Sequence, residues 1–399
     1  QKFIDYNIRD VELVDMFEEK LGLITLAMTM AYRGGCNYEE VFGTTTIWDT
    51  IIYRILNLQK IAVPAKTEKP KGDFAGGYVK DPQVGSHDWV TSFDLNSLYP
   101  MIIVQYNMSP ETVVDGLVDT DVPRMMAGVT NTSGPYAIAP SGVRFTKEKE
   151  GIIPSVIRQY YAERKQIKRQ MLDAQSEYEV NPTKELMNKI ATLDNQQMSI
   201  KILMNSLYGA LGNRWFRYFD QRVAESITLA GQLSILWAER AVNKEMNTLL
   251  KSDKDYVIAI DTDSLYINMS KLVEQFSPKD PVKFLDKICR EHFEPVLTKS
   301  YVQLADYTNA YVNRMEMGRE VIADRGIWVA KKRYILNVHN NEGVQYAEPK
   351  MKIMGIEAIK SSTPQIVREK MKEMFHIIVN GTESDTQKYI STFKSEFRK

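Results

Sequence analysis

The sequence has 399 residues, of which 44% are hydrophobic and 26% charged, and its 51 basic and 51 acidic side chains give a formal net charge of zero. This composition is typical of globular proteins and excludes a low-complexity chain, and no apolar run is long enough to span a membrane. The length predicts two or three domains. The two cysteines, Cys36 and Cys289, exclude a disulfide framework and a CxxC zinc site. Because the first residue is Gln1 rather than methionine, we expect the sequence to be part of a longer protein.

The first part of the chain is predicted to be helical and then irregular. Apolar residues recur at helical spacing from Tyr6 to Arg33, and the pair Gly34-Gly35 provides a stop. A second helix is predicted from Thr46 to Leu58. Residues 64–88 are rich in proline, glycine and lysine, which predicts a linker.

A strand that ends in an acid is predicted next, followed by a helical hairpin. Residues 92–100 (SFDLNSLYP) combine an apolar run, Asp94 and a turn. Residues 115–145 show weak periodicity and are predicted to be irregular. Two long helices are predicted over residues 154–180 and about 184–207, which together form an antiparallel hairpin.

The hairpin carries a concentration of basic residues, although the chain as a whole is neutral. Arg164 and Lys168 share a face of the first helix, and Lys201, Asn205 and Tyr208 share a face of the second. If the hairpin tip lies near position 182, Arg164 is level with a residue near position 200. We therefore expect Arg164, Lys168 and Lys201 to converge; a solvated basic face is the alternative.

A β-hairpin with two carboxylates in its turn is predicted at residues 256–267. Apolar runs flank the four residues DTDS, which include Asp261 and Asp263. Acids this close repel each other unless a cation lies between them, and oxygen ligands suit Mg²⁺ or Mn²⁺. Asp94, also at a strand end, can share the same ions. A solvated turn is the alternative for DTDS taken alone.

The last part of the chain mixes helices with a strand hairpin. Helices are predicted over residues 220–250 and 280–300. A strand is predicted to begin at the run Lys331-Lys332-Arg333-Tyr334 and to turn at residues 340–343. Alternation then puts Lys332 and Tyr334 on one face, and an edge strand guarded by lysines is the alternative. A final helical region is predicted to begin with Thr363 as its N-cap and Pro364 as its first residue.

Three motifs in this order resemble a known family. The runs DLNSLYP, KILMNSLYG and DTDS resemble motifs A, B and C of the family B DNA polymerases, and within them the replicative enzymes of T4-like phages. The runs NSLYGALGN, WFRY, KKRY and AEPK extend the resemblance over residues 6–364. It implies an α+β right-hand polymerase fold: an antiparallel palm sheet, a two-helix fingers hairpin, a partial N-terminal lobe and a partial thumb.

The resemblance also implies a division into domains. Residues 1–63 correspond to the C-terminal end of an exonuclease domain and residues 64–88 to a linker. The palm comprises residues 89–153 and 213–355, the fingers residues 154–212, and the start of the thumb residues 356–399.

The implied activity is template-directed addition of a dNMP to a primer 3′-hydroxyl, with release of pyrophosphate, in viral DNA replication. The implied partners are primer-template DNA and dNTPs. A sliding clamp and a second polymerase polypeptide that supplies missing parts are further candidates, and no membrane is involved. The expected location is the cytoplasm of an infected bacterial host.

The resemblance assigns roles to individual residues. Asp94 and Asp263 are implied ligands of two Mg²⁺ ions, which Mn²⁺ can replace; the Leu95 carbonyl binds one ion and Asp261 supports the site. Tyr99 is expected to pack under the sugar and exclude a 2′-hydroxyl, and Lys201 to donate a proton to pyrophosphate as well as binding it. The other implied nucleotide-binding residues are Ser97, Leu98, Arg164, Lys168, Asn205 and Tyr208. The implied DNA-binding residues are Gly76, Gly77, Lys331, Lys332, Arg333 and Tyr334.

Two features depart from the family pattern and leave rival hypotheses. Ile260 stands in a position where the family usually has glycine, which places primer contact in question. Tyr6 and Asp10 resemble the third exonuclease motif, but the acids of the earlier motifs are absent, so we predict no proofreading by this chain alone. One rival is a split or truncated polymerase piece that binds primer-template and needs a partner chain for turnover. Another is a different palm-type nucleotidyl transferase, against which motif B and the KKRY run argue.

Overall fold

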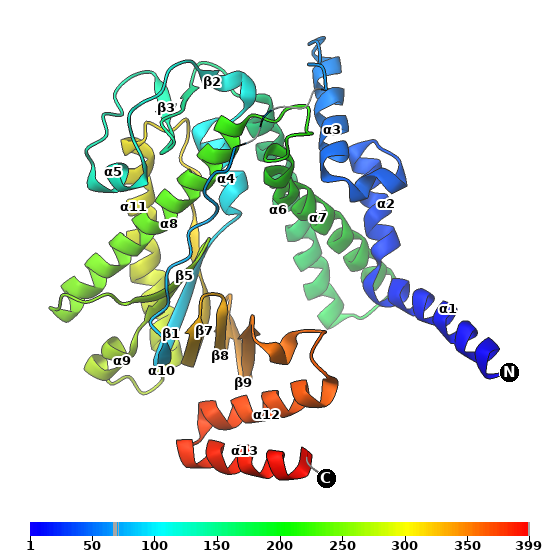
Figure 1. Cartoon of the computed structure of the whole chain (residues 1–399), viewed down its shortest axis with the longest axis vertical. Coiled ribbons are helices and arrows are strands. Elements are labelled where there is room, and N and C mark those ends of the chain that lie inside the picture. Colours follow the sequence, from blue (N-terminus) through cyan, green and yellow to red (C-terminus); the bar gives the residue numbers. More distant parts are fainter. Residues whose placement is uncertain (67–69, 71, 398–399) are drawn as a thin grey trace.

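The computed structural model describes residues 1–66, 70 and 72–397, apart from the side chain of residue 179. Its chain forms an antiparallel sheet with helices packed against it, and a helical arm that extends to one side (Figure 1). The predicted α+β class is therefore confirmed. Within the described residues, no helix combines the length and the apolar character needed to cross a membrane.

The sheet has six strands in the order β5-β6-β1-β7-β8-β9, all paired antiparallel. Its centre is β1, which lies between β6 and β7, so the end of β1 is flanked by the DTDS hairpin on one side. The strands are Gly85–Leu95 (β1), Val257–Asp261 (β5), Ser264–Asn268 (β6), Met317–Ala330 (β7), Arg333–Asn341 (β8) and Val344–Met354 (β9).

The two faces of the sheet belong to different apolar clusters, as strand alternation requires. On β6, Leu265 and Ile267 join the main core, whereas Tyr266 faces a second cluster with Trp328 and Tyr334. On the main-core face, the sheet packs against helices that include Gln221–Leu250 (α8), Pro281–Ile288 (α10) and Glu294–Tyr307 (α11). The acid-bearing end of the sheet therefore rests on a buried support.

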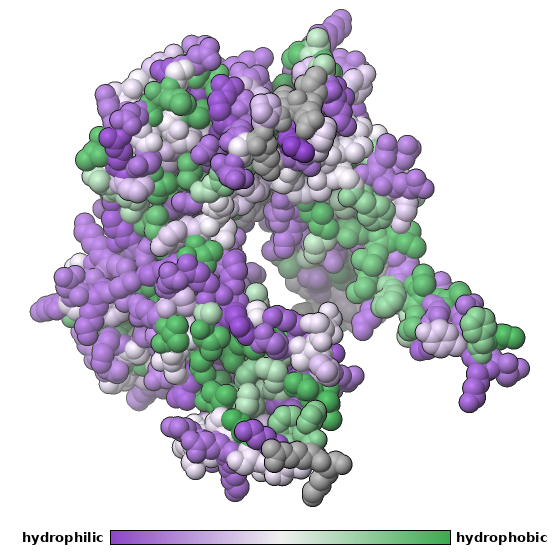
Figure 2. Space-filling model, in the orientation of Figure 1, coloured by the Kyte–Doolittle hydropathy of each residue, from purple (hydrophilic) through white to green (hydrophobic). Residues whose placement is uncertain are grey.

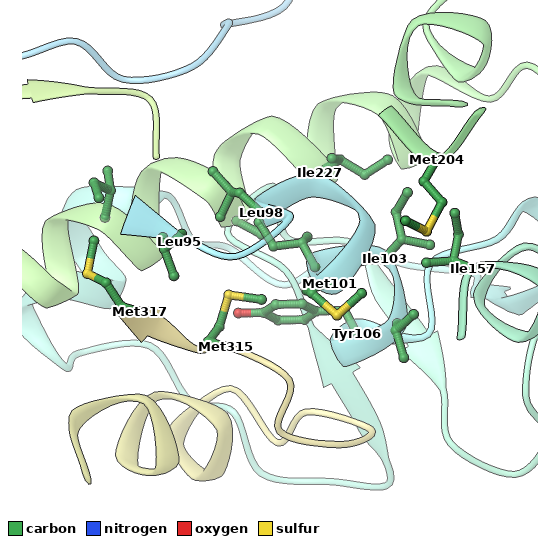
Figure 3. Close-up of a cluster of buried hydrophobic side chains, with 14 of the residues drawn as sticks. Leu95, Leu98, Met101, Ile103, Tyr106, Ile157, Met204, Ile227, Met315 and Met317 are labelled. Atoms are coloured by element: carbon green, nitrogen blue, oxygen red, sulfur yellow. The ribbon is translucent and has the colours of Figure 1, made fainter. Parts of the chain in front are cut away.

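The turn after β1 is held by a buried helix, Leu98–Tyr106 (α4). Figure 3 shows α4 surrounded by side chains from β1, β7 and the neighbouring helices. Its eight buried residues leave only Tyr99 partly exposed. The buried residues labelled in the figure are Leu95, Leu98, Met101, Ile103, Tyr106, Ile157, Met204, Ile227, Met315 and Met317.

The helical arm consists of Ile152–Val180 (α6) and Lys184–Leu211 (α7), with Leu23–Gly34 (α2) packed along α7 (Figure 1). The Thr183 hydroxyl accepts a hydrogen bond from Leu186 N–H and so caps α7. The second helix ends at Leu211, beyond the predicted end at residue 207, because its apolar face remains buried as far as Ala210 and Leu211. An antiparallel helical hairpin was predicted here, and the structure has one.

The N-terminal helix predicted over residues 6–33 is wrong as a single element. The chain forms Lys2–Leu21 (α1) and α2, separated by Gly22, whose φ of 59° cannot continue a right-handed helix. The Glu18 carboxylate accepts the backbone N–H groups of Ile24 and Thr25, which stabilises the break. The next helix, Thr44–Leu58 (α3), begins two residues before the predicted start.

Other predicted boundaries also need correction. The segment 115–145 contains Val122–Ala127 (α5) and most of a small sheet, so it is not wholly irregular. The helix predicted over residues 280–300 is α10 and α11, joined by a π-helical turn at Cys289–Phe293; Pro295 lacks the N–H that a continuous α-helix would use. The strands of the small sheet are Val113–Val114 (β2), Tyr136–Ile138 (β3) and Arg144–Thr146 (β4).

At the C-terminal end, the predicted helix start is displaced by one residue. Pro364 is the N-cap and the helix begins at Gln365, so Thr363 lies outside it. The remaining helices are Ser270–Phe276 (α9), Gln365–Asn380 (α12) and Glu383–Phe397 (α13), and the 3-10 turns are Tyr38–Phe42, Pro110–Thr112 and Glu357–Ile359.

Candidate active site

Strand pairing brings the two predicted acidic segments together. Asp94 pairs with Ser264 in the β1–β6 register, and the Ser264 hydroxyl donates a hydrogen bond of 2.6 Å to the Asp94 carboxylate. The backbone N–H of Leu95 donates to the Asp263 carbonyl at 3.0 Å. Asp94 and the turn containing Asp261 and Asp263 therefore occupy one end of the sheet, although Asp261 follows Asp94 by 167 positions in the sequence.

Burial and mutual repulsion disfavour the ionised carboxylates of this site, so a bound cation would stabilise them. Burial, with the Asp94 and Asp261 carboxylates nearby, raises the pKa of Asp263 to about 6. Burial also raises the pKa of Asp94, which the Ser264 hydrogen bond offsets in part. A divalent cation bound between the Asp94 and Asp263 carboxyl groups would stabilise their ionised form. Among the described residues no cluster of three or more metal-ligating side chains is gathered.

A further carboxylate, Glu320 on β7, adds to this field. Burial is the main cause of the raised pKa of Asp94, and the negative charge of Glu320 raises that pKa further, against the lowering effect of the Ser264 hydrogen bond. The Ser92 hydroxyl and the Lys352 ammonium hold Glu320 at 3.2 and 2.9 Å. Sequence reasoning missed this residue, because only the pairing of β7 with β1 brings it near Asp94, and next to Arg319 it gives no distinctive signal in its own segment.

Asp261 is already paired with a cation from the same protein. The Lys332 ammonium lies 2.5 Å from its carboxylate. Lys331 and Lys332 form the turn before β8 and not the start of a strand, and Lys332 has a φ of 59°. The lysine run thus reaches back to the DTDS turn.

The other residues of that run differ in accessibility. Lys331 pairs with Asp81 at 3.0 Å, and the Arg333 guanidinium bonds Glu357 at 2.5 Å. Tyr334 is only 5% exposed, and its hydroxyl shares a 2.6 Å hydrogen bond with Tyr266. The two lysines and Arg333 are therefore the accessible members of this DNA-binding prediction, whereas Tyr334 is buried.

Tyr99 stands in a slot at the start of α4. Its ring centroid lies 4.7 Å from that of Tyr208 on α7. A side chain on Gly231 would begin 3.0 Å from the Tyr99 ring, and one on Gly77 would begin 3.0 Å from its hydroxyl. Burial, Tyr208 and Asp263 raise the pKa of Tyr99 to about 12, so the hydroxyl stays protonated.

The segment just before α4 provides free backbone donors. Ser97 has a φ of 55° and serves as the N-cap, and Leu98 is the first helical residue. The first N–H groups of a helix have no partner within the helix, and they favour phosphate oxygens. Ser97 and Leu98, which are predicted to bind the triphosphate, directly precede Tyr99 in the chain.

The basic residues of the hairpin form a row along its length. The Arg164 guanidinium donates to the Gln197 side chain at 3.3 Å, which sets the level of the two helices. From that level, Lys201 and Lys168 lie on opposite sides of Arg164, about 12 Å apart along the helix axis. No described residue pairs with either lysine. Asn205 is exposed beyond Lys201, and Tyr208 follows beside Tyr99.

The remaining predicted residues lie away from this cluster or at its edge. The Gly76 carbonyl accepts a 2.6 Å hydrogen bond from Gln232, and Gly77 lies next to Thr262 and Tyr99. Tyr6 and Asp10 are exposed on α1, a helix with no buried residue. Figure 2 shows apolar side chains on the surface of this helix and of α2.

Comparison with known proteins identifies relatives of the whole arrangement. The model of DNA polymerase family B matches residues 43–399. The DNA-directed DNA polymerase of Enterobacteria phage T4 is 34% identical over 100% of this chain and 51% of its own length. That of Escherichia phage RB69 is 35% identical over 94% of this chain and 48% of its own. DNA polymerase 1 of Pyrococcus abyssi is 29% identical over 77% of this chain and 32% of its own length.

The chain spans about half the length of the curated phage relatives it matches. The matched region includes both strand-end acids, the paired tyrosines and the basic helical hairpin. With a family match that covers most of its length, this chain belongs to DNA polymerase family B.

Proposed function

We propose that this chain carries the nucleotidyl-transfer site of a phage-type replicative DNA polymerase, which adds dNMP units to a primer 3′-hydroxyl and releases pyrophosphate. The observation that carries the proposal is the position of Asp94 beside the Asp261–Asp263 turn, with the rings of Tyr99 and Tyr208 in contact next to it. Family membership and the phage relatives support the same activity.

The residues present fit a pair of Mg²⁺ ions, with Mn²⁺ as a substitute. Asp94 and Asp263 supply hard oxygen ligands whose charge is costly to bury, and the Leu95 carbonyl is adjacent. When bound, the ions lower the pKa of an attacking hydroxyl and stabilise charge on phosphate. Asp261 supports the site and keeps Lys332 close to it.

The hairpin and α4 position the nucleotide. Lys201 and Arg164 neutralise the triphosphate, with Lys168 and Asn205 farther along the row, and Ser97 and Leu98 offer backbone N–H groups. The Tyr99 ring, held by Tyr208, leaves no room for a 2′-hydroxyl. Lys201 also provides a proton to the departing pyrophosphate.

We further assign the elements to the parts of a right-hand polymerase. The six-stranded sheet with α8, α10 and α11 is the palm, α6 and α7 are the fingers, and α12 and α13 begin a thumb. Residues 1–63 belong to the end of an exonuclease region and residues 64–88 connect it to the palm. Primer-template DNA lies over Lys331 and Lys332, with Gly76 and Gly77 beside the template. The protein acts in an infected bacterial host.

A second candidate is a primer-template-binding piece that needs another polypeptide for turnover. It is favoured by the apolar side chains that α1 exposes. A second polymerase polypeptide or a sliding clamp would then complete the enzyme.

Primer extension separates these candidates. The purified chain is incubated with primer-template, Mg²⁺ and dNTPs beside two variants, Asp263→Ala and the exposed control Asp253→Ala. We expect extension by the parent and the control and none by Asp263→Ala. Equal extension by all three would refute the assigned site. DNA binding without extension by any of them would support the binding piece.

A further inference from the structure

Part of the predicted linker is a strap that pairs with the edge of the sheet. We define the strap as residues 76–83. The strap runs antiparallel to β5: the N–H of Lys80 donates to the Ile260 carbonyl at 3.2 Å, and that of Gln83 donates to the Ile258 carbonyl at 2.8 Å. Val79 forms an antiparallel bridge with Asp261. The strap thereby covers the otherwise open edge of β5.

The strap also holds the turn between the two acids. Thr262 separates Asp261 from Asp263 and has a φ of 59°, a conformation that a β-branched residue adopts only when its surroundings impose it. The Thr262 N–H donates to the Tyr78 carbonyl at 2.9 Å. A strap carbonyl therefore fixes the strained residue on which the direction of both carboxylates depends.

The side chain of Lys80 anchors the strap to α8 and to the start of β5. Its ammonium lies 2.5 Å from Glu239, 2.5 Å from Asp255 and 2.7 Å from the Val257 carbonyl, so all three of its N–H donors are used. The Lys80 and Glu239 side chains are each 16% exposed. Burial alone would lower the pKa of Lys80, but the bonds to Asp255 and Glu239 outweigh it and raise that pKa.

A single helix holds the strap at two points. Gln232 bonds the Gly76 carbonyl, and Glu239 bonds Lys80. These two α8 residues are seven positions apart in the sequence, which places them on one face and about 10 Å apart along the axis. Because α8 is packed in the main core, it gives the strap a fixed base.

We propose that Lys80 is a positioning residue for the active site: its clamp to Glu239 and Asp255 fixes the strap, and the strap fixes the Asp261–Asp263 turn in the geometry that binds a divalent cation with Asp94. Its consequence for catalysis rests on the proposed function. The clamp acts through the backbone, since the Lys80 ammonium is bonded at the far end of β5, at Asp255 and Val257.

The test measures the turn and the cation site without requiring turnover. The variants are Lys80→Met, which removes the clamp, and Glu239→Gln, which keeps a hydrogen-bond acceptor but loses one charge. Lys283→Met, at an exposed helical lysine paired with Asp280, is the matched control. Hydrogen exchange by mass spectrometry follows peptides that contain Thr262, and electron paramagnetic resonance titration measures Mn²⁺ binding, with Asp263→Ala as background.

We expect Lys80→Met to speed exchange at the Thr262 turn and weaken Mn²⁺ binding, each on the order of tenfold. Glu239→Gln should do the same to a smaller degree, and Lys283→Met should match the parent. Unchanged exchange or unchanged Mn²⁺ binding in Lys80→Met would overturn the proposal. So would an equal acceleration in peptides from β7 and β8, since that would indicate global loosening.

The outcome is independent of the extension assay. If the clamp variants respond as expected but neither they nor the parent extend a primer, the proposed function fails and the positioning role stands. If the parent extends and Lys80→Met retains tight Mn²⁺ binding, the positioning role fails and the proposed function stands.

Discussion

The sheet and the helical hairpin present their charges in opposite ways. At the sheet, Asp94 accepts a hydrogen bond from β6 and Asp261 pairs with Lys332, so the carboxylates are held before any ligand arrives. On the hairpin, neither Lys168 nor Lys201 pairs with a described residue. Fixed buried carboxylates select a cation by geometry, whereas exposed lysines can follow a phosphate chain. We therefore expect sheet substitutions to act on cation binding and rate, and hairpin substitutions on nucleotide affinity.

The largest effect is expected at the sheet. Asp94→Asn should lower the extension rate on the order of 10³-fold, because it removes charge that a cation and the reacting phosphate require. Its melting temperature should not fall, since burial disfavours the ionised Asp94 carboxylate. Rapid-quench extension and thermal unfolding measure the two quantities. A large drop in melting temperature would show that Asp94 stabilises the fold, and the contrast between the sheet carboxylates and the hairpin lysines would then no longer be one of function.

The next effect tests the hairpin. Lys201→Ala should reduce kcat/KM for dNTP by about 100-fold, through KM because a phosphate contact is lost and through kcat because the proton donor to pyrophosphate is lost. Lys168→Ala, about 12 Å farther along the row, should cost about tenfold or less. Single-nucleotide incorporation at low and high salt measures both, and the losses should shrink as salt rises. Equal losses in the two variants would mean that the lysines converge on one point.

A smaller effect should appear in stability and depend on pH. The folded-state pKa of Asp263 is raised to about 6, so the folded protein prefers the protonated carboxyl. The stability that the protonated carboxyl contributes is present at low pH and is lost as pH rises toward and through 6. At pH 7.5, urea unfolding should therefore give Asp263→Asn a free energy of unfolding on the order of 1 kcal/mol higher than that of the parent. This difference in unfolding free energy should disappear below about pH 4.

Mg²⁺ sharpens the same measurement. At pH 7.5 it should stabilise the parent and narrow the gap, because it binds the folded carboxylates, and it should have little effect on Asp263→Asn. An identical Mg²⁺ response in both proteins would contradict a cation site at this turn.

These two regions also differ in how far sequence reasoning reaches. Asp94 was predicted because it ends an apolar strand pattern, and Asp261 and Asp263 because they lie in a turn between two apolar runs, which is local information. The roles of Asp94 and Asp263 as metal ligands came from the family resemblance. The hairpin was predicted from helical periodicity over long windows. Glu320 was missed because its position near Asp94 depends on the register of β7 against β1, and a register is not contained in one segment.

Tertiary contacts also changed the meaning of residues that were predicted. Tyr334 was expected to contact DNA, but Trp328 and Tyr266 enclose its ring. Lys80 lies in a stretch whose composition is typical of a linker, and its function as an anchor arises only because Glu239 and Asp255 meet it in space. Gly22 interrupts a regular helical pattern because the Glu18 carboxylate caps the following helix.

The smallest effect is expected outside both regions, at Asp10. We expect Asp10→Ala to leave primer extension unchanged and the purified chain to digest no mismatched 3′ end with or without the substitution. Two-metal hydrolysis needs several convergent carboxylates, and Asp10 lies exposed on α1, where no residue is buried. Gel assays on a mismatched primer measure this. Digestion that Asp10→Ala abolishes would mean that other acids of this chain gather around α1 when DNA binds, and the contrast between a prebuilt sheet site and exposed helical charges would no longer hold.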